Sequence, residues 1–228
     1  MGKNKLARFS ELSTFSNTYQ NYDVKDPKLV DCEGDEVEMK GSWQEKHFKN
    51  NNPIVLELAC GGGEYTVALA KKYPDKNVIG VDIKGNRIWK GAKIAMEENI
   101  SNAAFLRTRI EQLDLFFGKD EVSEIWITFP DPFLRKSKAQ RRLTSSRFLK
   151  IYRKVLKENG LVHLKTDDPT LYKFTVDTIE EEKINMVYHN DDIYSAELFT
   201  EELEVKTYYE RMHLEHGKTI KYVRYTIN

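Results

Sequence analysis

The hydrophobic pattern alternates between two periods from residue 54 onward. Short apolar runs rich in valine, isoleucine and leucine alternate with longer stretches in which apolar residues recur every three or four positions. The short runs predict strands at 54–58, 77–83, 104–107, 124–129, 161–166, 186–190 and 220–227. Strands and helices that alternate in this way predict an α/β fold, a doubly wound, Rossmann-like sheet of seven mostly parallel strands.

The longer stretches predict helices whose ends carry capping signals. Thr144 or Ser145 is expected to cap one helix, and Asn159-Gly160 is expected to end it. Asp168-Pro169 predicts the start of another helix, because proline suits the first helical position. The remaining helices are expected at 64–73, 85–98 and 207–215.

Residues 1–50 show little periodicity of either kind. They predict an irregular, basic N-terminal arm that includes one short helix, with Lys3, Lys5 and Arg8 near its start. The domain organisation expected from the pattern is therefore an arm over residues 1–50 and one catalytic or binding domain over residues 51–228.

Three glycines, Gly61, Gly62 and Gly63, follow the first predicted strand and precede a helix. A strand, a glycine turn and a helix N-terminus in this order bring bare backbone close to a nucleotide-like ligand. A dinucleotide fingerprint requires a further glycine where Thr66 stands. Glu57, inside the preceding strand, would repel a pyrophosphate but suits a sulfonium and an α-amino group. The turn therefore favours S-adenosylmethionine over NAD.

Asp82 ends the second predicted strand, after the glycine turn. A carboxylate at that place can accept hydrogen bonds from both ribose hydroxyls of either cofactor class. Asp82 therefore indicates nucleotide binding without choosing the nucleotide, and a helix cap is the alternative role.

The fourth of these strands ends in Pro130-Asp131-Pro132, which predicts a rigid loop carrying one carboxylate. Ligands of doubly wound sheets bind beyond the carboxyl ends of the strands, so Asp131 is expected above the cofactor. Asp131 is the only acid between residues 129 and 154, where nine basic residues occur: Arg135, Lys136, Lys138, Arg141, Arg142, Arg147, Lys150, Arg153 and Lys154. This combination suits a polyanion whose base must reach a methyl donor, although a solvated charged face would give the same run.

Composition narrows the class of protein further. The 228 residues carry 40% hydrophobic and 32% charged residues with a formal net charge of zero, which argues against a generic nucleic-acid binder. No apolar run approaches the roughly 18–20 residues that cross a bilayer, and the N-terminus shows no signal sequence. Cys32 and Cys60 are too few for a disulfide framework, and no cluster has metal-ligand spacing. We therefore expect a cytoplasmic protein, monomeric or homodimeric, that binds no membrane and no metal.

From about Trp43 to the C-terminus the chain resembles the bacterial tRNA (guanine-N7-)-methyltransferase family. The resemblance rests on several motifs in the same order: LELACGGGEYTVALAKKYP, VIGVDIKGNRI, PDPFLRKSKAQRRLTSSRFL, LVHLKTDD and KTYYERMHLEHGKTIKYVRY. It implies a class I methyltransferase that uses S-adenosylmethionine to methylate guanine 46 in the variable loop of tRNA.

The resemblance also implies roles for individual positions. Glu57, Gly61, Gly63, Asp82, Arg109 and Asp131 fall at cofactor positions, and Asp131 is also the implied catalytic or guanine-contacting acid. Substrate positions are Arg135, Asp167 and the Thr-x-x-Glu motif formed by Thr207 and Glu210. We further expect Lys138, Arg141 and Arg142 to bind tRNA phosphates.

Four positions depart from the family pattern. Asp82 replaces the usual glutamate, and Phe133-Leu134 replaces Trp-Pro after Asp131-Pro132. The family's polar residue near the adenine falls at about Arg109, so a backbone group or Glu111 is expected to make the adenine contact. The alternatives from the sequence are a methyltransferase for another RNA position or a small molecule, an NAD-dependent oxidoreductase, and a non-catalytic RNA-binding module.

Overall fold

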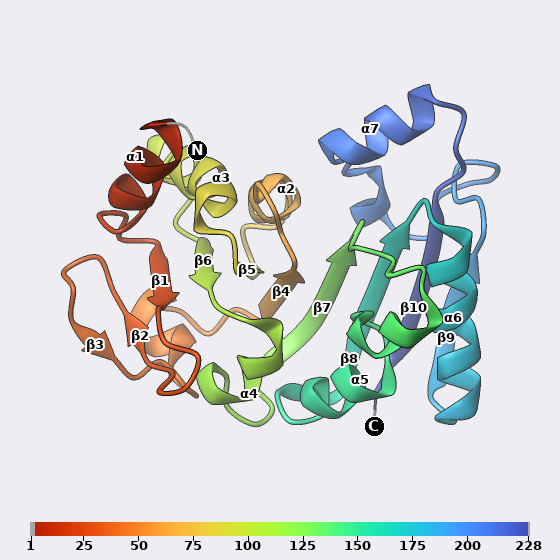
Figure 1. The fold of residues 1–228 in the computed structure, drawn as a ribbon, viewed down its shortest axis with the longest axis horizontal. Coiled ribbons are helices and arrows are strands. Elements are labelled where there is room, and N and C mark those ends of the chain that lie inside the picture. Colours follow the sequence, from red (N-terminus) through yellow and green to blue (C-terminus); the bar gives the residue numbers. More distant parts are fainter. Residues whose placement is uncertain (1–2, 228) are drawn as a thin grey trace.

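The computed structural model describes residues 3–227, which form one large sheet with helices on both faces (Figure 1). The sheet has ten strands in the order β3-β2-β1-β6-β5-β4-β7-β8-β10-β9. The seven predicted strands are all present, as β4 (Ile54–Leu58), β5 (Asn77–Asp82), β6 (Ala103–Arg107), β7 (Val122–Thr128), β8 (Leu156–Thr166), β9 (Asn185–Asn190) and β10 (Lys221–Thr226). Neighbours from β6 to β8 pair in parallel, whereas β10 is antiparallel to both β8 and β9.

The extra strands come from the first fifty residues, so the predicted count of seven and the predicted irregular arm are both wrong. This segment forms α1 (Lys3–Leu12), β1 (Thr18–Asn21), β2 (Leu29–Val30), β3 (Glu36–Val37) and the short π-helix η1 (Gln44–Phe48). Strand β1 pairs in parallel with β6 and therefore extends the central sheet. All four β1 residues are buried although three are polar, which is why no hydrophobic pattern revealed the strand.

The helices follow the prediction except near residue 150. The longer ones are α2 (Glu64–Lys72), α3 (Gly85–Glu97), α5 (Ser146–Tyr152), α6 (Pro169–Glu181) and α7 (Tyr208–Glu215). Helix α5 ends before the predicted Asn159-Gly160 stop, and both of these residues lie inside β8. Asn159 has φ = 59°, and the pairing with β7 shifts there, so the Asn-Gly pair forms a bulge in a strand rather than a helix end.

Short helices complete the chain. They are η2 (Ile110–Gln112), α4 (Leu113–Phe116), η3 (Lys136–Arg141) and η4 (Glu201–Glu204). Among residues 3–227, no helix combines the length and the apolar character that crossing a membrane requires.

The buried side chains form two clusters, one on each face of the sheet. Alternate residues of β4 divide between them: Leu56 belongs to one cluster and Val55 to the other, as strand geometry requires. Leu12 and Ile88, from α1 and α3, join the Val55 cluster, whereas α5 and α6 pack on the opposite face. This layering leaves the carboxyl ends of the parallel strands free to form a site.

Candidate active site

Two adjoining cavities lie at the carboxyl ends of β4, β5, β6 and β7. The first has a volume of about 800 Å³ and the second about 610 Å³. Ala59, Arg87, Phe129, Pro130 and Asp131 line both of them. A ligand with two ends can therefore reach from one cavity to the other past Asp131.

The glycine turn after β4 forms the floor of the first cavity. Gly61 and Gly63 have φ values of 55° and 69°, and Gly63 is the N-cap residue of α2. A Cβ atom on Gly63 would lie 2.5 Å from Phe105 Cε1 and 3.2 Å from Gly91 Cα, so no side chain fits there. The turn thus needs glycine both for its left-handed backbone and for the close packing of α2 against α3 and β6.

Glu57 lies in the wall of the first cavity at only 2% exposure. Its Oε2 accepts hydrogen bonds from the Thr66 backbone N–H (2.9 Å) and the Thr66 hydroxyl (2.5 Å), and its Oε1 accepts one from the Thr128 hydroxyl (2.7 Å). All three donors are neutral. Burial raises the pKa of Glu57 to about 7, although the hydrogen bonds oppose this rise. Residues 3–227 therefore hold a buried carboxyl group without supplying a cation for it.

Asp82, at the end of β5, faces the second cavity. Its Oδ2 accepts a hydrogen bond from the Gly61 N–H (3.0 Å), and its Oδ1 accepts one from the Lys84 N–H (2.8 Å). A carboxylate has about four acceptor sites, so Asp82 can lock the glycine turn and still accept hydrogen bonds from a diol. Arg109 and Glu111 line the same cavity, and Arg109 is exposed.

The loop after β7 places Asp131 at the boundary of the two cavities, where the residue is exposed. The residues that flank the Pro-Asp-Pro sequence, Phe129 and Phe133, have positive φ values of 49° and 43°. Such backbone persists only where the surroundings fix it. The fourth-strand loop is therefore a shaped element rather than a solvated turn.

Arg142 supplies part of that constraint. It is 5% exposed, and its guanidinium donates to the carbonyl oxygens of Pro132 (2.9 Å) and Phe133 (3.1 Å) while stacking 4.4 Å from the Phe174 ring centroid. The expectation that Arg142 binds a tRNA phosphate does not fit this geometry, because its donors are used inside the protein. Arg135, Lys138 and Arg141 belong to or flank η3, and of these three only Arg141 lines a cavity.

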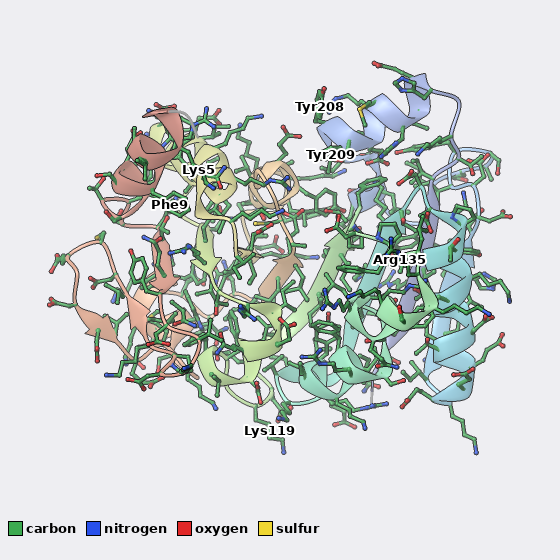
Figure 2. All side chains as sticks on the ribbon, viewed as in Figure 1. Lys5, Phe9, Lys119, Arg135, Tyr208 and Tyr209 are labelled. Carbon is green, nitrogen blue, oxygen red and sulfur yellow. The ribbon has the colours of Figure 1, made fainter. Side chains whose placement is uncertain are left out.

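Helix α7 forms part of the wall of the first cavity. Tyr208 and Tyr209, at the start of this helix, are exposed (Figure 2). Thr207 and Glu210 form a capping box at this helix N-terminus. The Glu210 side chain is fully buried, lies 2.8 Å from the fully buried Lys165 amino group and accepts a hydrogen bond from the Tyr194 hydroxyl (2.6 Å). Thr207 lines the cavity but Glu210 does not. The Thr-x-x-Glu pair is thus split between the cavity wall and the interior.

Asp167, at the end of β8, also lines the first cavity. Two groups from the α7 region contact it: the Lys218 amino group at 2.5 Å and His213 Nε2 at 3.5 Å. The His213 ring in turn stacks against Phe129, with 5.9 Å between ring centroids. A ligand that takes Asp167 as an acceptor must therefore share it with Lys218.

Comparison with known proteins assigns the chain to a family. Residues 51–223 match a methyltransferase family model. The chain is 47% identical over 226 residues to the tRNA (guanine-N(7)-)-methyltransferase of Christiangramia forsetii, covering 99% of this chain and 98% of that protein. It is 45% identical over 228 residues to the enzyme of the same name from Bacteroides fragilis, covering 100% of this chain and 87% of that protein.

The chain belongs to the tRNA (guanine-N(7)-)-methyltransferase family. Solved structures agree on the fold: the 16S rRNA methyltransferase KamB superposes with a TM-score of 0.62 at 15% identity, covering 85% of this chain and 96% of that one. The predicted class I methyltransferase fold is therefore confirmed, with three more strands than the seven expected.

Some site residues of this methyltransferase carried no signal in the sequence. Thr66 and Thr128 hold Glu57, and Gly80 makes room for Thr66, because a Cβ atom there would lie 2.7 Å from the Thr66 hydroxyl. Thr66 stands where a dinucleotide fingerprint has glycine, and this departure was the only feature of the sequence that indicated a role for its side chain. His213 and Lys218 reach Asp167 only through the tertiary fold.

Proposed function

We propose that this methyltransferase transfers a methyl group from S-adenosylmethionine to N7 of guanine in tRNA, at guanine 46 of the variable loop. The observation that carries the proposal is the position of Asp131, an exposed carboxylate shared by two cavities. One cavity contains Glu57 and the glycine turn, and the other contains Asp82.

The donor and acceptor groups of both cavities fit S-adenosylmethionine. Gly61 and Gly62 line the first cavity without side chains, which allows a ligand to approach the backbone of the turn closely. Glu57 is buried among neutral donors, so a cationic amino group beside it would favour its ionised form. Asp82 has free acceptor capacity for a ribose diol in the second cavity. When bound, S-adenosylmethionine supplies the electrophilic methyl group.

Guanine N7 already carries a lone pair, so no residue is required to remove a proton first. The lone pair forms the new nitrogen–carbon bond as the bond between methyl carbon and sulfur breaks, and positive charge moves onto the purine. Asp131 accepts hydrogen bonds from guanine N1–H and N2–H in this proposal. It thereby orients N7 and stabilises the charge that grows on the base.

Cations of the η3 segment and aromatic rings at the first cavity suit an RNA substrate. Arg135, Lys138 and Arg141 have no ion-pair partner among the described residues. They can therefore contact phosphates, a contribution that depends on salt and not on sequence. Tyr208 and Tyr209, 58% and 51% exposed, provide surfaces on which an unpaired base can stack.

The test is methylation of a tRNA transcript with a labelled methyl donor, followed by reduction and aniline cleavage, which cuts at N7-methylguanine. A matched transcript carries adenine in place of guanine 46. We expect label and cleavage at position 46 in the first transcript and neither in the second. Label without cleavage would contradict methylation at N7, and cleavage elsewhere would contradict the position.

A further inference from the structure

Helix α1 packs on α3 beside the first cavity. The Glu11 carboxylate accepts hydrogen bonds from Trp89 Nε1 (2.8 Å) and from the Lys93 amino group (3.0 Å), and Leu12 is fully buried. This docking fixes Arg8 on the cavity rim, where its guanidinium lies 4.6 Å from a Trp89 ring centroid. The N-terminal segment therefore contributes a cation to the site.

A second cation, Arg107, lies at the end of β6 between two aromatic rings. Its guanidinium carbon is 5.2 Å from the ring centroids of both Phe9 and Tyr22. Among the described residues the guanidinium makes one hydrogen bond, which is long, 3.5 Å from Nη1 to Gln20 Oε1, and its Nε is buried without a partner. The rings hold the guanidinium in place but do not neutralise it, and burial lowers the pKa of Arg107. The group is therefore preorganised for an anion.

The neighbouring cations share this lack of carboxylate partners. On α3, Lys90 pairs with Glu64 at 2.8 Å and Lys93 pairs with Glu11 at 3.0 Å. No such ion pair within the described chain involves five further cations, which we call the N-terminal basic patch: Arg8, Lys84, Arg87, Arg107 and Arg109. Arg8 lines the first cavity, Lys84 and Arg109 line the second, Arg87 lines both, and Arg107 lies beside them at the end of β6. Two lysines of α3 thus have carboxylate partners, whereas the cations of the patch have none among the described residues.

The patch lies across the cavities from the basic residues of η3. In the sheet, β6 is two strands from β4 on one side, whereas β7, whose loop leads to η3, adjoins β4 on the other side. Figure 2 shows Lys5 and Phe9 of α1 on one flank of the molecule and Arg135 on the other. The two basic surfaces therefore flank the site instead of forming one continuous face.

We propose that the N-terminal basic patch binds phosphate groups of the tRNA substrate, so that the RNA is held on both sides of the cavities. This inference rests on the proposed function. Arginine donors match the geometry of phosphate oxygens, and the two rings hold the Arg107 guanidinium in one orientation, with its Nε buried. Tyr22, 57% exposed, adds a ring edge on which a nucleotide can pack. Because Arg8, Phe9 and Tyr22 come from the first fifty residues, this segment contributes to substrate binding in this proposal as well as to the sheet.

The experiment measures binding of full-length tRNA to the full chain as a function of salt concentration. The variants are Arg8→Ala, the double variant Arg8→Ala/Arg107→Met, and Lys119→Ala as the matched control, an exposed lysine distant from the patch (Figure 2). Methionine keeps an apolar stem between the two rings. Each phosphate that the protein no longer binds should reduce the salt slope by roughly 0.7–0.9, so the double variant should lower it by about 1.5 and the control should leave it unchanged.

Two further measurements keep the outcomes separable. Calorimetry of S-adenosylmethionine binding should give the wild-type dissociation constant for Arg8→Ala; a parallel loss of cofactor binding would overturn phosphate binding as the role of Arg8. The variant Arg107→Lys keeps the charge and should keep the salt slope. If Arg135→Ala/Arg141→Ala weakens tRNA binding while both patch variants match Lys119→Ala, the proposed function stands and this inference fails. If the wild-type chain neither binds nor methylates tRNA, the proposed function itself fails.

Discussion

Glu57 and Glu210 are both buried glutamates near the first cavity, but only one of them has a cation inside the protein. Glu57 accepts hydrogen bonds from the neutral groups of Thr66 and Thr128. Glu210 lies 2.8 Å from the amino group of Lys165, which is buried as deeply as its partner. The first carboxylate faces the cavity and the second does not.

The difference separates two uses of a buried acid. An ionised carboxylate in a protein interior is unfavourable unless a positive charge lies beside it. Lys165 meets this need for Glu210, and its amino group also donates to the carbonyls of Leu203 and Val205. Nothing in the described chain meets it for Glu57, so a ligand has to bring the cation. We therefore propose that Glu57 is a binding residue, and that Glu210 is a positioning residue that anchors α7 with Tyr208 and Tyr209 at the cavity.

The largest effect is expected from removing the cation of Glu210. In Lys165→Met the carboxylate is left buried and unpaired, so the free energy of unfolding, measured by urea denaturation, should fall by roughly 3–5 kcal/mol. The double variant Lys165→Met/Glu210→Gln should recover most of this loss and also tRNA binding, because no buried charge remains. Direct contact between Glu210 and the RNA predicts no recovery of tRNA binding in the double variant.

Asp131 differs from both buried glutamates, because it is exposed and its side chain has no hydrogen-bond or ion-pair partner among the described residues. Replacing it with asparagine keeps the shape of the loop but removes the charge that stabilises the methylated base. Turnover should fall by roughly 10²–10³-fold, the size of effect seen when one electrostatic partner of a transition state is removed. The dissociation constant for S-adenosylmethionine should stay near the wild-type value. An equal loss of turnover and cofactor affinity would contradict a role directed at guanine.

Glu57→Gln tests the binding residue of the pair. The amide keeps a similar shape but cannot balance a cationic amino group, so cofactor binding should weaken by about 1.5–3 kcal/mol, or roughly 10–150-fold. Stability should respond differently. Wild-type Glu57 titrates near pH 7 when folded and near 4.5 when unfolded, so its contribution is greatest below pH 4.5 and is lost as pH rises to 7. The variant should lack this part of the pH dependence, as urea denaturation at several pH values will show.

A smaller effect is expected at Arg142, which holds the loop that carries Asp131. Lysine cannot donate to the carbonyls of Pro132 and Phe133 in the same fork, so Arg142→Lys should lower kcat/KM by about tenfold. The salt slope of tRNA binding should remain unchanged. A reduced slope would instead support a phosphate contact at Arg142.

The sequence predicts the parallel core of the fold because its strands carry mainly apolar runs, such as Ile54–Leu58 with Glu57 as its one polar residue, that are buried on both faces. Strand β1 escaped prediction because its buried residues are polar and are satisfied by distant partners: Asn21 donates to Thr108 and Gln112. Hydrophobic periodicity cannot reveal a strand whose stability depends on hydrogen bonds from elsewhere in the chain.

The sequence predicts those residues of the candidate site that lie in or next to a recognisable strand. Glu57 lies within a strand that the sequence identifies, Asp82 ends another, and the glycine turn and Asp131 follow such strands. The sequence does not predict which side chains of the site are buried. Arg142 is one of nine basic residues between 129 and 154, yet it is buried and donates to carbonyl oxygens of the loop that carries Asp131. The cation beside Glu210 comes from a strand more than forty residues earlier, so the capping box alone gave no hint of an ion pair.

The most direct test of the central claim, that Glu57 is reserved for the cation of a ligand, is the proton balance of cofactor binding. Calorimetric titration with S-adenosylmethionine in buffers of different ionisation enthalpy measures this balance. At about pH 6 free Glu57 is largely protonated, since its pKa is about 7, whereas an α-amino group is fully charged. Binding should therefore release close to one proton per cofactor in the wild type and none in Glu57→Gln. Equal proton release in both proteins, or none in the wild type, would contradict the account.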